Sequence, residues 1–105
     1  MGQAPPMIGP DDIRKLALAF PEAHEAPHFD STSFRAKGKI FATMDPGFAD
    51  ASVVLKLDPE DQHNLAQSHP GAVVAIDGYW GRSGWTRVYT RDLASDDLAG
   101  FLRMA

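Results

Sequence analysis

The middle of the chain consists of short segments with alternating apolar and polar residues, separated by sequences that favour tight turns, and this pattern constrains the fold most strongly. The first segment begins near Ser33 and leads to Lys37-Gly38-Lys39, which predicts a hairpin turn with Gly38 at a positive φ. The second covers residues 39–44 and ends at the turn sequence Asp45-Pro46-Gly47. A third strand is expected over residues 52–57. Connections this short join antiparallel strands, so we expect an antiparallel sheet.

Three segments with helical character and two further strands complete the pattern. The helix expected over residues 11–20 carries its apolar side chains on one stripe and ends before Pro21. Asp58 and Ser95 are expected to be the N-caps of two later helices, because their side chains can accept a hydrogen bond from the first helical turn. The further strands are expected over residues 72–76 and 85–90.

This order of elements predicts an α+β fold, with an antiparallel sheet and helices packed on one of its faces. A chain of 105 residues is long enough for one domain, which we expect to cover residues 11–105. Residues 1–10 contain three prolines and two glycines and are expected to form a flexible N-terminal arm.

Composition excludes several kinds of chemistry. The chain has no cysteine, which rules out disulfides, thiolate metal sites and cysteine nucleophiles. No apolar run approaches the roughly 20 residues that span a bilayer, and the first residues do not resemble a signal peptide. We therefore expect a cytoplasmic monomer that does not bind membranes. The formal net charge of −4 is unusual for a dedicated nucleic-acid binder, unless the two signs of charge are segregated.

Two sequences resemble catalytic motifs without meeting their structural requirements. His24-Glu25-Ala26-Pro27-His28 matches the zinc-protease pattern H-E-x-x-H, which needs a helix to bring both histidines to one metal. Pro27 is unfavourable inside a helix and pushes Ala26 towards an extended conformation, so we interpret the segment as an extended loop. Gly81-Arg82-Ser83-Gly84 lacks the G-x-S-x-G pattern of a nucleophile elbow. We expect neither an enzyme nor a bound metal or cofactor.

The most distinctive segment is Gly78-Tyr79-Trp80-Gly81-Arg82-Ser83-Gly84-Trp85. Its glycines permit tight turns, and no helix is expected after them that would accept a pyrophosphate. Two interpretations remain open. The glycines serve the packing of the aromatic rings, or the segment is a loop that contacts a ligand through Tyr79, Trp80, Ser83 and Trp85.

Basic residues concentrate in the strands, whereas acidic residues concentrate at the helix starts. Seven of the ten basic residues lie in the sheet-forming part: Arg35, Lys37, Lys39, Lys56, Arg82, Arg87 and Arg91. Period-2 alternation predicts a sheet face that displays Arg35, Phe41, Lys56, Trp85, Arg87 and Tyr89. Cations between aromatic rings suit contact with a nucleic acid. They also suit an ordinary solvated face on which basic side chains cover aromatic rings.

The chain resembles the MmcQ/YjbR family of small bacterial proteins over nearly its whole length, from about Asp11 to Leu102. The resemblance is carried, in the family's order, by Ala26-Pro27-His28-Phe29, Ser33-Phe34-Arg35, Gly38-Lys39-Ile40-Phe41-Ala42, Leu55-Lys56-Leu57, and Gly78-Tyr79-Trp80-Gly81 followed by Gly84-Trp85. It implies a compact α+β domain similar to the frataxin/CyaY fold. By analogy with a double-wing motif, it also implies DNA binding, although fold analogy alone does not establish a function.

The sequence therefore leaves two alternative functions open. In the first, the sheet face and its hairpin bind DNA or another polyanion through Arg35, Lys37, Lys39, Lys56, Arg82 and Arg87. In the second, the segment 78–85 forms a groove for a small molecule or a peptide, because exposed tryptophan and arginine are common binding anchors.

Overall fold

The computed structural model describes residues 8–28, 31–45, 51–91 and 93–105. Six strands form one sheet in the order β1-β2-β3-β4-β6-β5, and every neighbouring pair is antiparallel. The strands are β1 His24–His28, β2 Ser31–Ala36, β3 Lys39–Met44, β4 Ser52–Lys56, β5 Val73–Ala75 and β6 Trp85–Tyr89. The predicted antiparallel sheet is thus confirmed, with one more strand than the alternation indicated.

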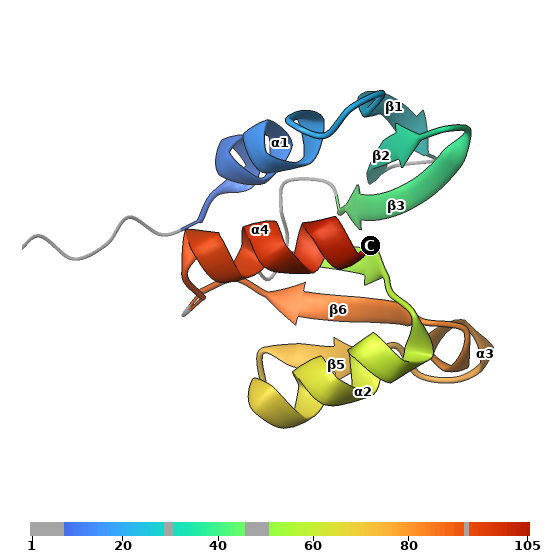
Figure 1. Ribbon diagram of the computed structural model, residues 1–105, viewed down its shortest axis with the longest axis vertical. Helices are drawn as coiled ribbons and strands as arrows, with labels where there is room; N and C mark the ends of the chain where they lie inside the picture. The colour runs from blue at the N-terminus through green and yellow to red at the C-terminus, as the bar shows by residue number, and fades with distance from the viewer. Residues whose placement is uncertain (1–7, 29–30, 46–50, 92) are drawn as a thin grey trace, which may run out of the picture.

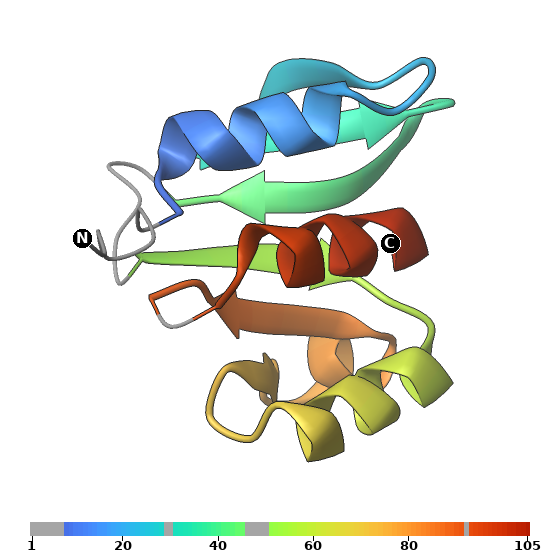
Figure 2. The same cartoon turned by 60° about the vertical axis from the view of Figure 1, so that its left-hand side comes forward.

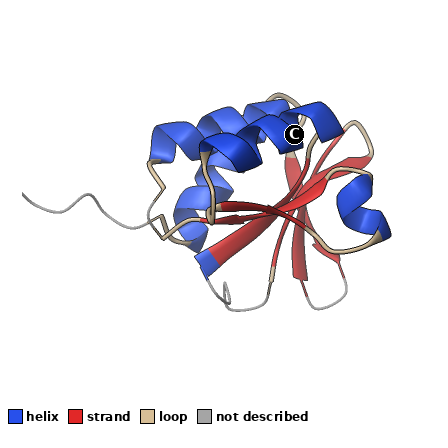
Figure 3. Ribbon diagram, turned by 90° about the horizontal axis from the view of Figure 1, so that it is seen from below, coloured by secondary structure: helices blue, strands red, loops and turns tan. Residues whose placement is uncertain are grey.

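Three long helices cover one face of the sheet. They are α1 Pro10–Leu18, α2 Pro59–Ser68 and α4 Ser95–Met104, and in Figure 2 all three lie in front of the strands. Figure 3 shows the same layer from another direction, with the long helices gathered along one side of the sheet. The one-turn helix α3, Tyr79–Arg82, instead lies behind β6 in Figure 2. The α+β fold with helices on one face is confirmed, and we call the opposite side of the sheet the open face.

The core lies between the long helices and the sheet. From the strands it takes the fully buried Phe34, Ala42, Val53, Leu55 and Val88, and from the helices Ile13, Ala17, Leu98 and Leu102. Ile8, which falls within the predicted N-terminal arm, is also buried in this core, with 2% of its surface exposed.

A β-bulge between β2 and β3 turns Phe41 towards the helices. Phe34 pairs with Ala42 and Arg35 pairs with Ile40, so Phe41 is an extra residue with no partner in the ladder. Its ring packs edge to face on Phe20, with centroids 6.3 Å apart. The prediction that Phe41 lies on the open face is therefore wrong, because simple alternation fails at a bulge.

The N-cap predicted for α2 is confirmed, and the N-cap predicted for α4 is wrong. Asp58 is the N-cap of α2, and its carboxylate accepts a hydrogen bond from the Glu60 N–H at 3.0 Å. Ser95 was expected to cap α4, but Ala94 occupies the cap position and Ser95 is the first helical residue. Without a capping side chain, α4 relies on its buried apolar face and on Asp96 and Asp97 in its first turn.

Two other segments differ from the expectation. Residues 24–28 form the edge strand β1 rather than a loop, and Tyr79–Arg82 form a helical turn where only loop was expected. Phe29, the Pro46-Gly47 part of the second turn and residues 1–7 of the predicted arm lie outside the described residues.

Candidate functional site: a pocket on the open face

Register places residues from four strands in rows on the open face. Thr43 lies opposite Val54, Val54 opposite Arg87, and Arg87 opposite Val74. In the next row Lys56 lies opposite Trp85. These two rows of the open face therefore mix apolar residues with the cations Arg87 and Lys56.

A pocket of about 270 Å³ lies on this face. Thr43 of β3 and Val54 of β4 come from the sheet itself, and Trp85 is the first residue of β6. Ile76, which follows β5, and Trp80 of α3 complete the lining. Sequence analysis had singled out the two tryptophans only. The sequence carries no signal for Thr43, Val54 and Ile76, because their place in the lining depends on how the strands pair.

Trp80 and Tyr79 are the most exposed large aromatic residues that the structure describes. Trp80 is 61% exposed and Tyr79 is 67% exposed, and their rings meet edge to face with centroids 5.6 Å apart. Only Trp80 of the two lines the pocket. Ser83, the C-cap of α3, donates its hydroxyl to the Trp80 carbonyl at 3.0 Å. The predicted ligand segment thus divides into Trp80 and Trp85, which face the pocket, and Tyr79 and Ser83, which do not line it.

Two glycines allow the α3 turn to pack against its neighbours. A Cβ atom on Gly81 would lie 1.6 Å from the Ile76 carbonyl oxygen, and one on Gly84 would lie 1.8 Å from the Leu57 carbonyl oxygen. Gly84 also has a φ of 112° and accepts a hydrogen bond from the Leu57 N–H at 2.9 Å. These contacts settle the role of both glycines as close packing, and the same packing brings Trp80 to the pocket.

The buried Gln62 of α2 holds the α3 turn to β6. Its Nε2 donates to the Gly81 carbonyl at 2.9 Å, the Thr86 hydroxyl at 2.9 Å and the Trp85 carbonyl at 3.2 Å. Gln62 therefore connects the helix layer to the segment that carries both tryptophans. Sequence reasoning missed it, because a glutamine in a helix gives no signal of burial.

Lys56 lies at the rim of the pocket. On the open face it has Val54 two residues before it in β4 and Trp85 directly opposite it on β6. Its ammonium group donates to the carbonyl of Ser83. Within the described parts of the chain, no carboxylate forms an ion pair with it.

Arg87 and Arg35 are engaged elsewhere. The Arg87 guanidinium contacts the Asp45 carboxylate at 3.2 Å and the Ser52 hydroxyl at 2.8 Å, on the side away from Trp85. Arg35 donates from Nε to the Ser33 hydroxyl at 3.0 Å. Both arginines therefore already have protein partners on the open face.

The other predicted cations lie at one end of the sheet. Lys37 and Lys39, at the β2–β3 turn, and Arg82, on α3, are all exposed. In Figure 1 this turn and α3 both lie at the right-hand end of the molecule. The antiparallel pairing of β4 with β3 and β6 places Lys56, the last residue of β4, at the end where β3 and β6 begin. We call Lys37, Lys39, Lys56 and Arg82 the basic end. The acidic residues Asp58 and Asp77 follow β4 and β5 at the same end.

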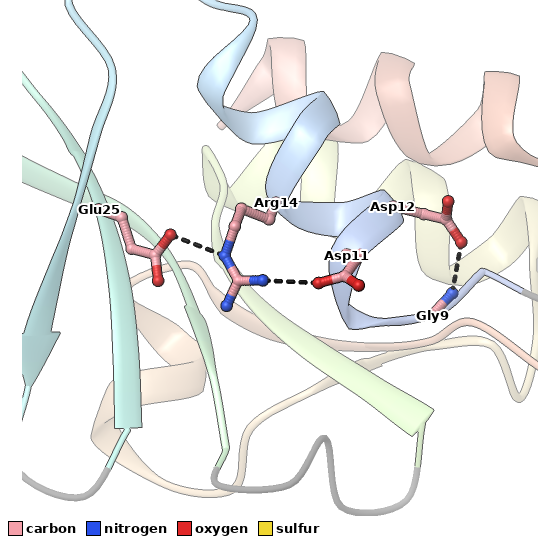
Figure 4. A network of polar contacts seen from close by, with 5 residues as sticks. All are labelled: Gly9, Asp11, Asp12, Arg14 and Glu25. Atoms are coloured by element: carbon pink, nitrogen blue, oxygen red, sulfur yellow. Dashed lines mark hydrogen bonds and ion pairs between the residues drawn. The ribbon is translucent and has the colours of Figure 1, made fainter.

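A separate polar network joins α1 to the edge strand β1. In Figure 4, Arg14 lies between Asp11 and Glu25, with an N–O distance of 2.8 Å to each. The hydrogen bond to Glu25 and the charge of that carboxylate raise the pKa of Arg14. The network is on the surface and links α1 to the edge strand β1.

The structure shows neither a metal cluster nor a membrane-spanning helix in the part of the chain that it describes. No three His, Cys, Asp or Glu side chains gather there in a way that could hold a metal ion. His24 and His28 lie at opposite ends of β1, about 13 Å apart for an extended strand. None of the described helices is long and apolar enough to cross a bilayer.

The fold and the pocket define an α+β domain whose sheet is covered on one side and carries an aromatic site on the other. A family model described as YjbR matches residues 18–105, and the chain therefore belongs to the YjbR family, as its motifs indicated. No curated protein matches it. The crystal structure of the Deinococcus radiodurans protein DR2400, described as having a DUF419 domain, is similar, with a TM-score of 0.74 and 25% identity. That match covers 89% of this chain and 72% of the other.

Proposed function

We propose that the open-face pocket binds one flat ring system of a small molecule, either a single ring or two fused rings, and that the chain is a binding module rather than an enzyme. The observation that carries the proposal is the pocket of about 270 Å³ between Trp80, Trp85, Ile76, Val54 and Thr43. Two of these lining residues, Trp80 and Trp85, lie next to Gly81 and Gly84 in the most distinctive segment of the chain.

The size and lining of the pocket support a small aromatic ligand. Pockets for drug-sized molecules are usually about 300–1,000 Å³, so a smaller volume suits a single ring system. Tryptophan rings stack on flat apolar groups, and Thr43, which carries a hydroxyl, is one of the lining residues. Trp80 is 61% exposed, which leaves its ring accessible to a ligand.

The lining also supports binding without catalysis. The described residues that form it carry one hydroxyl and no carboxylate, imidazole or thiol. A general acid or base needs such a group, or a lysine or tyrosine, within hydrogen-bond reach of the bound molecule, and none of the five lining residues provides one.

The test is a titration with 1-naphthaleneacetamide, a neutral two-ring probe, followed by ¹⁵N–¹H NMR and calorimetry. We expect saturable shifts of the Trp80 and Trp85 indole N–H signals. Trp80→Ala should weaken binding about tenfold, because it removes one aromatic wall. Tyr79→Ala is the matched control, since Tyr79 is similarly exposed in the same turn but does not line the pocket. Absence of indole shifts at millimolar probe would contradict the proposal.

A second candidate is polyanion binding through the basic end and Arg35. It is favoured by one observation: among the described residues, none of Lys37, Lys39, Lys56, Arg82 and Arg35 pairs with a carboxylate. Against it stand the net charge of −4 and the acidic residues Asp58 and Asp77 at the same end. Arg87, the sixth predicted cation, is already paired with Asp45.

Fluorescence anisotropy with short single- and double-stranded DNA tests this second candidate. Polyanion binding should weaken steeply as salt rises, because it releases counterions. The double variant Lys37→Gln/Lys39→Gln should weaken the binding of DNA further. Failure to detect salt-sensitive binding at tens of micromolar protein would reject the candidate.

A further inference from the structure

We propose that the molecule in the open-face pocket is an aromatic anion, whose ring lies between Trp80 and Trp85 and whose carboxylate or phosphate binds the ammonium group of Lys56. This inference rests on the function proposed above. It adds the charge of the ligand and names the residue that recognises that charge.

Lys56 is placed where a substituent on a bound ring would reach it. It neighbours two lining residues, Val54 along its own strand and Trp85 across the β4–β6 pair. Under this proposal, a group that projects from the pocket between these two residues reaches the Lys56 side chain.

The state of the Lys56 ammonium group favours an anion. The side chain is half-buried, and its only described hydrogen bond goes to the neutral carbonyl of Ser83. An ammonium group has three N–H donors, so at least one remains for a ligand. A partly desolvated charge without a counter-ion is unfavourable, and an anionic ligand would supply the missing charge-assisted hydrogen bond.

The neighbouring cations are less suitable for this role. Arg87 is drawn towards Asp45 and Ser52, away from Trp85. Arg82 is exposed on α3, so its charge is already solvated, whereas Lys56 is half-buried. Lys56 is therefore the cation that combines proximity to the pocket with a free charge.

The experiment compares 1-naphthaleneacetate with 1-naphthaleneacetamide, which have the same ring and nearly the same shape but differ in charge. We expect the acid to bind about tenfold more tightly than the amide, as one charge-assisted hydrogen bond would give. 1-Naphthyl phosphate is a third probe, and it distinguishes a site for carboxylates from one for phosphates.

The key variant is Lys56→Met, which keeps the apolar stem and removes the charge. It should lose the preference for the acid while still binding the amide. Lys39→Met is the matched control, because it removes an exposed cation at the same end of the sheet but not at the pocket. In the unmodified chain, raising the salt concentration should weaken binding of the acid and leave binding of the amide unchanged. This comparison tests the inference without any variant.

The outcomes separate this inference from the function on which it rests. Equal affinity for acid and amide, with the indole signals still shifting, overturns the anion inference and leaves the ring site intact. A preference for the acid that survives Lys56→Met assigns the anion to another residue and also overturns it. If neither probe shifts the tryptophan signals, both proposals fail.

Discussion

At two glycines near the end of the sheet, the surrounding backbone leaves no room for a side chain. Added Cβ atoms would lie 1.6 Å and 1.8 Å from backbone oxygens at Gly81 and Gly84, and backbone cannot move aside as a side chain can. We expect Gly81→Ala and Gly84→Ala each to lower the free energy of unfolding by at least about 3 kcal/mol. Urea denaturation followed by circular dichroism measures the change.

Gly100 provides the control for these variants. It lies inside α4, and a Cβ atom there would meet nothing within 4 Å. Gly100→Ala should therefore stabilise the protein by about 0.5–1 kcal/mol through higher helix propensity. Equal changes in the free energy of unfolding at all three glycines would show that the close contacts do not cause the loss of stability.

Lys37 is a residue in an unfavourable backbone conformation. It has a φ of 54° and is followed by Gly38 at 79°, so the two-residue loop between β2 and β3 is a type I′ turn. Asn is preferred at the first position of this turn. We expect Lys37→Asn to raise stability by about 0.5–1 kcal/mol, seen as a higher melting temperature. Lys39→Asn, outside the turn, should bring no such gain.

At the scale of elements, Gln62 joins α2 to α3 and β6 through three hydrogen bonds. Gln62→Leu keeps the volume and leaves buried acceptors with fewer donors, which should cost about 1–3 kcal/mol. The Trp80 and Trp85 indole signals should also shift. Gln67→Leu, on the exposed side of the same helix, is expected neither to lower the stability nor to shift the indole signals. Unchanged indole signals in Gln62→Leu would mean that Gln62 does not position the pocket.

The sequence predicted the elements whose pattern is local. Alternation located β3, β4 and β6, and the Asp58-Pro59 pair located the start of α2. Strand β1 was missed because Pro27 argued against regular structure, although proline is compatible with an edge strand. Helix α3 was missed because Gly81 lies inside it and Gly84 follows it, and glycines disfavour a helix. Their close contacts with Ile76 and Leu57 appear only in the folded chain.

The candidate site was predictable in part. Trp80 and Trp85 stood out by type, and Lys56 and Arg87 were placed on the open face by alternation. Thr43 and Ile76 were not recognisable, because their role arises only when β3, β4, β6 and the end of β5 lie side by side. The bulge that removes Phe41 from this face also depends on pairing with β2.

At the scale of the whole molecule, both edges of the sheet discourage pairing with a second chain. β5 has three residues, and β1 contains Pro27, which has no N–H to offer. We expect a monomer in sedimentation velocity over a wide concentration range. Pro27→Thr should increase self-association, whereas Pro59→Ala, on α2, should not. A stable dimer of the unmodified chain would contradict this expectation.

The close packing at Gly81 and Gly84 also separates what can vary in this protein from what cannot. A mutation at either glycine is opposed by the fold itself, whatever the pocket holds. Trp80 is exposed and leaves the core untouched when it changes, so we expect a substitution there to alter the proposed binding without a loss of stability. The two glycines are therefore tied to the architecture of this segment, and Trp80 to the function proposed for it. A second chain with the same glycines would share this turn, and it would share the ligand only if it also kept the tryptophan.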